Sequence, residues 1–394
     1  MEIKSLRMTR RTFVYNAALG TLHLGLVGLP AKPPESALKS LQIDLNTPDV
    51  PLSRLAMPGL FPRRVVEAYH PQAIVNRRIS DVAVRRMVED GMKALTGEST
   101  AMHAWSKFID ASDVVALKVN PSGVPETTTS LALVREVVRS LNSVGVPNKN
   151  IVVYDRNSNQ LEVNGYHALV PPGVRVVGLD ERSSIAGEIQ DGYDRNAYCE
   201  MNCFGERETR SYLARLVSSE VDKIINLPCL KEHNASGVTG CLKNLAYGSF
   251  NNVNRTHVTP KTYTDPVIAV MCSAAPLRAK AVLNIVDGIR AVYHSGPFAW
   301  NPEFVWEAKT LLFGTDPVAV DRIELEIVEQ KRREVRVPSL LERNPQNLGS
   351  RTEMEQTAHK NPFYREPGHI KTASELGLGT WELSAIEHRR LRLT

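Results

Sequence analysis

The feature that most constrains the fold is an alternation of short apolar runs and segments of helical periodicity between residues 113 and 327. The runs Val114–Val119 and Ile151–Tyr154 have the length of buried strands, and the segment between them spaces its leucines and valines three and four residues apart. A strand, a helix and a strand within about 40 residues form a βαβ unit, whose two strands are parallel. The pattern predicts an α/β fold with a mostly parallel sheet flanked by helices.

The remaining elements follow from the same signals. Ser80 is expected to cap a helix, and Asp316-Pro317 is expected to open another that runs to residue 327. Residues 180–207 are expected to form a polar, irregular insertion. Further strands are predicted at 174–177, 223–227, 281–286 and 310–313, and further helices at 209–217, 238–250 and 373–376.

The chain divides into four predicted segments. The first is an export signal, and the second is a proline-punctuated segment with helices that wraps the core. The third is the α/β core domain, and the last is an irregular C-terminal extension. In order, their bounds are 1–30, 31–112, 113–334 and 335–394.

The N-terminus resembles a twin-arginine export signal. Arg10 and Arg11 precede an apolar run, Ala17–Leu29, of about 13 residues, which is too short to span a bilayer core of about 30 Å. The pattern predicts an exported, periplasmic protein that uses the twin-arginine translocation machinery as a partner. The alternative is an ordinary amphipathic first helix that follows two surface arginines.

Composition excludes several classes of protein. The formal net charge of the 394 residues is +5, and +3 of it lies in residues 1–30, so the rest carries no basic footprint for nucleic acid. No run reaches about 18 apolar residues, so we expect no stable membrane span in the mature protein. The five cysteines form no C-x-x-C pair and no ferredoxin-like run, so we expect no iron–sulfur cluster. We expect no disulfide framework either, because a core this large does not need one. Cys199 and Cys203 are spaced as on adjacent turns of a helix.

Polar residues follow several of the predicted strands. In parallel sheets, ligands bind outside the C-terminal ends of the strands. We therefore expect a binding site there, although Asp and Asn after strands also form turns and helix caps. The strand-end residues are Lys118, Asn120, Asp155, Asn157, Asn226, Lys231, His233, Asp287 and Asp316.

A glycine-bearing loop follows one of these strands. Gly237 and Gly240 would let the backbone approach a ligand closely, and the N–H groups at the helix start attract negative charge. Thr239 adds a hydroxyl, and Lys243 and Asn244 lie one turn into the helix. The loop is predicted to bind a small anionic molecule or cofactor; the alternative is a tight loop with a surface lysine.

The chain resembles the family named domain of unknown function 362. The central likeness is Ile225–His233 followed by Gly237–Asn244, an LP-x-LK-x-H segment and then G-x-T-G-x-x-KN. Some members of that family carry ferredoxin-type clusters, but this chain lacks the cysteines. In order, the likeness extends over roughly residues 113–380 through Leu117–Asn120, Val286–Ile289 with Gly296-Pro297, Asp316–Asp321 and Ala373–Gly379.

A looser local likeness concerns the nickel-pincer lactate racemases. His233 has Gly, Thr, Gly and Lys at +4, +6, +7 and +10, which is similar to the matching stretch of those enzymes. The resemblance implies that Lys243 anchors a covalent cofactor and that His233 is a general base. Those enzymes have a second histidine after an earlier strand, where this chain has Asp155–Asn157.

Three functional hypotheses result. The first is an exported enzyme, an oxidoreductase or isomerase, in which His233, Lys243 and Asp287 do acid–base or redox chemistry. It would use a covalently attached small cofactor or a metal ion held by His233, Asp287 and Asp316, although no close ligand pair fixes such a site. The second is a non-catalytic periplasmic binding protein, and the third is an accessory protein for an exported redox enzyme. The predicted binding residues are Lys118, Asn120, Asp155, Asn226, Lys231, Gly237, Thr239, Gly240, Lys243 and Asn244.

Overall fold

The computed structural model describes part of the chain. Most of the predicted export signal lies outside the described residues. The part that is described, strand β1 (Arg11–Phe13), pairs antiparallel with β2 (Ile43–Asn46). The described residues are 11–13, 43–123, 126–179, 192–203, 205–256, 262–341 and 367–394.

The central element is a large, mostly parallel sheet. Its main path has the order β17-β3-β16-β14-β11-β6-β7-β8. Only β16 is antiparallel to its neighbours, β3 and β14; every other adjacent pair on the path is parallel. The predicted α/β class is confirmed. The strands are β3 (Arg64–Tyr69), β6 (Val115–Val119), β7 (Ile151–Asp155), β8 (Arg175–Gly178), β11 (Lys223–Leu227), β14 (Ala281–Val292), β16 (Thr310–Gly314) and β17 (Glu387–Arg392).

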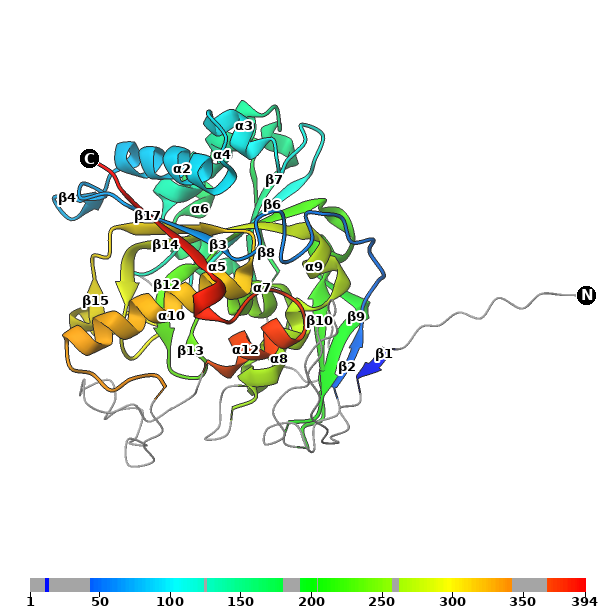
Figure 1. Cartoon of the computed structure of the whole chain (residues 1–394). Coiled ribbons are helices and arrows are strands. Elements are labelled where there is room, and N and C mark those ends of the chain that lie inside the picture. The colour runs from blue at the N-terminus through cyan, green and yellow to red at the C-terminus, as the bar shows by residue number, and fades with distance from the viewer. Residues whose placement is uncertain are drawn as a thin grey trace, which may run out of the picture.

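Helices cover both faces of this sheet (Figure 1). One layer contains α2 (Asp81–Thr96), α3 (Ala101–Trp105) and α4 (Leu131–Ser143). The other contains α7 (Gly240–Ser249), α8 (Thr264–Cys272), α10 (Pro317–Glu334) and α12 (Gly368–Glu375). Side chains alternate along each strand, so Leu117 packs in the core under the first layer and Ala116 in the core under the second. None of the described helices is long and apolar enough to cross a membrane.

The helix caps were predictable from the sequence. The Ser80 side chain accepts the Ala83 N–H at the start of α2, as predicted. Asp316 accepts the Ala319 N–H at the start of α10, which ends at Glu334 rather than at residue 327.

A second sheet corrects two sequence predictions. Strands β9 (Tyr193–Met201) and β10 (Arg210–Ala214) form an antiparallel pair, with β2 on the other edge of β9. The helix predicted at 209–217 is therefore wrong, and so is the irregular structure predicted for the part of 180–207 that is described. A short apolar run is compatible with a helix or a strand, and here the pairing with β9 makes it a strand. Cys199 lies in β9, so Cys199 and Cys203 are not on adjacent helical turns.

The chain ends also contribute to the main sheet. Strand β3, from the predicted wrapping segment, and β17, from the predicted C-terminal extension, are parallel neighbours at its edge. Strand β14 runs six residues past its predicted end at 286. Its extra length pairs with β12 (Cys229–His233) and β15 (Val305–Trp306). A short strand, β13 (Gly237–Val238), pairs back on β12 and leads into α7.

Candidate functional site

The register of the main sheet aligns three polar residues on neighbouring strands. Asn226 of β11 lies opposite Lys118 of β6 on one side and opposite Asn284 of β14 on the other. Lys118 is two residues from Ala116, and Asn226 is two residues from Ile224, so both point to the face that α7 covers. The sheet therefore presents a row of polar side chains under this helix.

Asn244 of α7 forms hydrogen bonds with the polar side chains of this row. Its Oδ1 accepts hydrogen bonds from Lys118 Nζ and Asn120 Nδ2, each at 3.0 Å. Its Nδ2 donates to Asn226 Oδ1 at 2.8 Å, and Asn226 in turn donates to Asn284 Oδ1 at 2.9 Å. Every one of these side chains is buried, and a fully paired polar network of this kind fixes the orientation of its members.

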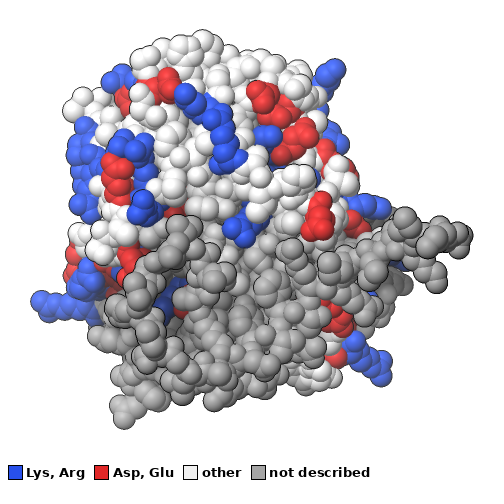
Figure 2. Space-filling view, turned by 45° about the vertical axis from the view of Figure 1, so that its right-hand side comes forward, with Lys and Arg blue, Asp and Glu red and all other residues white. Residues whose placement is uncertain are grey.

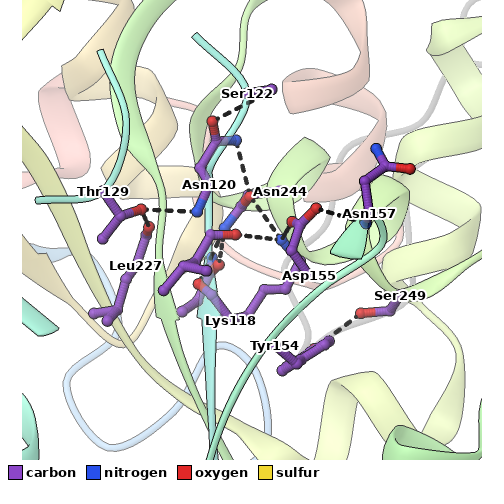
Figure 3. A network of polar contacts seen from close by, with 12 residues as sticks. Lys118, Asn120, Ser122, Thr129, Tyr154, Asp155, Asn157, Leu227, Asn244 and Ser249 are labelled. Atoms are coloured by element: carbon purple, nitrogen blue, oxygen red, sulfur yellow. Dashed lines mark hydrogen bonds and ion pairs between the residues drawn. The ribbon is translucent and has the colours of Figure 1, made fainter. Parts of the chain in front are cut away.

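Lys118 and Asp155 form a buried ion pair at the centre of the site (Figure 3). The Lys118 Nζ lies 2.6 Å from Asp155 Oδ2 and also donates to the Val119 carbonyl. Burial lowers the pKa of Lys118, while the Asp155 carboxylate opposes this shift. Gly248 of α7 lies directly against the Lys118 side chain, where an added Cβ would collide with it. The glycine lets the helix pass close over the lysine.

A pocket of about 340 Å³ opens beside this network. It brings together most of the residues that the sequence predicted for the site, and it lies at the C-terminal ends of β6 and β7 as expected. Asn226, Lys231, Gly237 and Gly240 do not line it. The predicted residues that do are Lys118, Asn120, Asp155, Asn157, His233, Thr239, Lys243 and Asn244.

The pKa of Lys243, which lines the pocket, is strongly lowered. Burial lowers its pKa to about 7, and the positive charges of Lys231, Arg156 and Lys118 act in the same direction. Its Nζ lies 4.9 Å from the centre of the Tyr247 ring, one helical turn on. Among the described residues, its ammonium forms no ion pair with a carboxylate. Lys243 therefore changes its charge near neutral pH.

Lys231 supports the pocket from behind. Its side chain is fully buried, and its Nζ donates to Asn120 Oδ1 at 2.6 Å and to the Ser122 carbonyl. Burial lowers the pKa of Lys231 to about 8. The lysine positions Asn120 and adds positive charge behind the pocket wall.

The hydrogen bonds of His233 assign its tautomer. The ring is 2% exposed, and its Nδ1 accepts the Ala235 N–H at 3.0 Å. A neutral imidazole whose Nδ1 accepts carries its proton on Nε2. In this state the Nε2–H of His233 is a hydrogen-bond donor. The general-base role implied by the nickel-pincer likeness requires the proton on Nδ1, so this hydrogen bond favours a role for His233 as a hydrogen-bond donor.

Thr239 offers a hydroxyl to the pocket. It is 2% exposed, and its Oγ1 has no hydrogen-bond partner among the described residues. An unpaired buried hydroxyl costs about 1–3 kcal/mol. A bound molecule that hydrogen-bonds this hydroxyl would offset that cost.

The two glycines of the loop have packing roles. Both have positive φ, +78° at Gly237 and +60° at Gly240. A Cβ on Gly240 would collide with the Asp321 carboxylate, which accepts the N–H groups of Cys241 and Leu242 at the start of α7. A side chain of this protein thus occupies the helix N-terminus that was predicted to bind an anion. Gly237 packs against Pro367 instead.

The three residues predicted as metal ligands are not brought together. Asp287 accepts the backbone N–H groups of Ser130 and Ile289, and Asp316 accepts those of Ala319 and Arg63. Neither aspartate lines the pocket that His233 lines. Over the described ranges, no group of three or more His, Cys, Asp or Glu side chains is arranged to hold a metal ion. Asp287, predicted as catalytic, and Asp316 hold backbone groups together.

The pocket also contains residues that sequence reasoning did not assign to it. Arg156 follows Asp155 directly, and Tyr247 lies four residues after Lys243 on one helix face, so spacing alone could have indicated both. Phe298 directly follows Gly296-Pro297, a pair that belongs to the family likeness. The additional lining residues are Ser122, Arg156, Gln160, Asn234, Tyr247, Gly248, Asn254, Pro297 and Phe298.

Comparison with known proteins bears on the family alone. The model of one family, described as domain of unknown function (DUF362), matches residues 115–326, more than half of the chain. The matched stretch contains all the residues that line the pocket. A search of curated proteins finds no match. The chain therefore belongs to the family of domain of unknown function 362.

Proposed function

We propose that the pocket binds a small anionic molecule and that Lys243 exchanges a proton with it. His233 would donate a hydrogen bond through Nε2, and Thr239 would donate another through its hydroxyl. Proton exchange by a positioned amine with a pKa near 7 is general acid–base catalysis. Of the hypotheses above, this proposal is that of an enzyme rather than that of a non-catalytic binding protein.

The charge balance of the pocket supports an anionic ligand. Lys118, Arg156 and Lys243 line it, and Asp155, the single carboxylate of its described lining, is already bonded to Lys118. On the face of the molecule shown in Figure 2, by contrast, Lys and Arg side chains are interspersed with Asp and Glu. The excess of positive charge is therefore a property of the pocket.

The observation that carries the proposal is the position of Lys243 in a pocket lined by Lys118 and Arg156, whose single carboxylate, Asp155, is already paired with Lys118; the lowered pKa of Lys243 supports it. A lysine kept near pKa 7 by burial and three neighbouring cations is unfavourable for the empty protein. An anion in the pocket would relieve this repulsion. Perturbed titratable groups of this kind concentrate at functional sites. The nickel-pincer likeness depends on the same lysine, and covalent attachment of a cofactor to it stays a prediction.

Replacement of Lys243 tests the proposal. Lys243→Met keeps the length of the side chain and removes its charge, so we expect inorganic sulfate to bind about tenfold more weakly, since hydrogen bonds to charged groups contribute about 1.5–3 kcal/mol. Isothermal titration of sulfate into the full-length protein measures the change. Lys149→Met is the matched control, because Lys149 is exposed and does not line the pocket. Equal sulfate affinity of the native and Lys243→Met proteins would overturn the proposal.

We also propose that the chain is exported by the twin-arginine route. Arg10-Arg11 followed by a short apolar run supports this route. With both arginines replaced by lysine, which keeps the charge, we expect the full-length protein to remain in the cytoplasm of its host. Cell fractionation and immunoblotting measure this. Unchanged export of the Arg10→Lys, Arg11→Lys variant would contradict the route.

A further inference from the structure

One aromatic ring lines the pocket, and a second ring packs on it. Phe298 lines it, and its ring stacks on that of Trp300 with 5.5 Å between the centroids and 25° between the planes. Trp300 is 57% exposed. Such a large exposed aromatic side chain beside a pocket is a feature of binding sites rather than of cores.

The loop that carries these rings is fixed to the strand that carries His233. The Gly296 N–H donates to Glu232 Oε2 at 2.6 Å, and the Gly296 carbonyl accepts the Asn234 N–H at 3.2 Å. A Cβ on Gly296 would collide with the Glu232 backbone, so the loop packs directly on β12. These bonds hold Phe298 at a set position relative to His233, which is the preorganisation that a ligand-binding ring requires.

The pocket therefore has two chemically different parts. Lys118, Arg156 and Lys243 provide the cationic part, and Pro297 and Phe298 provide an apolar part backed by Trp300. Its volume of about 340 Å³ is at the lower end of the range for small-molecule sites, about 300–1,000 Å³. A molecule with one charged group and one ring fits this division.

We propose that the anionic ligand carries an aromatic ring that stacks on Phe298. The inference rests on the proposed anion site and specifies the substrate class as small aromatic acids, either carboxylates or phosphate esters. Aromatic pairs in offset stacking gain more than the burial of the same area by an aliphatic group. Phe298 then selects between ligands that have the same charge and similar size.

Four probes separate the contributions of ring and charge. Benzoate and phenyl phosphate each have a saturated counterpart, cyclohexanecarboxylate and cyclohexyl phosphate, which match them in charge but are not planar. We expect both aromatic probes to bind the full-length protein roughly 3- to 10-fold more tightly than their counterparts, in line with the known strength of aromatic pairs. Isothermal titration gives the affinities.

Phe298→Leu removes the ring and keeps an apolar side chain. We expect it to abolish the preference for the aromatic probes while leaving the affinity for the cyclohexyl probes and sulfate within about twofold. Phe61→Leu is the matched control, since Phe61 is partly exposed and does not line the pocket. It should keep the preference.

The outcomes distinguish the two proposals. Equal affinities for aromatic and saturated probes in the native protein, or a preference that survives Phe298→Leu, would overturn the aromatic class and leave the anion site intact. Failure of all four probes and of sulfate to bind would overturn the anion site itself, and the aromatic class with it.

Discussion

Replacing Asp155 by alanine is expected to destabilise the folded protein by about 3–5 kcal/mol, the usual loss when one partner of a buried ion pair is removed. The variant would leave the Lys118 ammonium with no exposed surface and only neutral partners, the Val119 carbonyl and Asn244 Oδ1. Urea unfolding followed by circular dichroism measures the loss. The native network is well paired, so little of it can relax to compensate.

The matched control removes both charges. Lys118→Met together with Asp155→Leu fills the same space with apolar side chains, and we expect it to lose far less stability than Asp155→Ala alone. The single variant should also recover as pH rises. Without Asp155, the pKa of Lys118 in the folded protein falls further below its unfolded value of 10.5. Between these two pKa values the unfolded chain binds more protons than the folded protein, so the stability of the variant increases with pH in this range. A single variant as stable as the double variant would show that the pair is not coupled.

The position of the site in the sheet could be predicted from the sequence, but the hydrogen bonds between its residues could not. Apolar runs ending in Lys118-Val119-Asn120 and in Asp155 indicate strands whose C-terminal ends meet at one edge. The row formed by Lys118, Asn226 and Asn284 depends on the register between strands that lie far apart in the chain. Register is set by the packing of whole faces, which no local pattern specifies.

The predictions that the structure corrects fail for one physical reason. Carboxylates that follow strands are suitable ligands, so Asp287 and Asp316 are predicted as metal ligands. In the structure, their oxygens instead accept hydrogen bonds from backbone N–H groups of distant segments. Asp321 fills the helix start near Gly240 in the same way. Buried backbone groups must be paired, and a nearby side chain of the protein competes with any ligand for them. A sequence alone does not show which partner is closer.

The affinity for sulfate is expected to decrease as pH rises above about 7, by up to tenfold for each pH unit. Lys243, whose pKa is about 7 in the empty pocket, binds the anion in its charged form, and the bound anion raises this pKa. Below pH 7 the lysine is already protonated, so the affinity stays constant. Above pH 7 each binding event must take up a proton, and this uptake continues until the pKa of the complex is reached.

Sulfate suits this measurement because it does not itself titrate in the range, so the proton uptake belongs to the protein. Titrations at pH 6 and pH 9 in two buffers of different ionisation enthalpy give both the affinity and the number of protons taken up. Lys243→Met should remove the step near pH 7, whereas a step that belonged to Lys231, with its pKa of about 8, would persist in that variant. Since Lys231 donates to Asn120 and Ser122 behind the pocket wall and does not line the pocket, we expect its titration to add little to the change in sulfate affinity. A native affinity that is the same at pH 6 and pH 9 would mean that Lys243 does not bind the anion as a charged group.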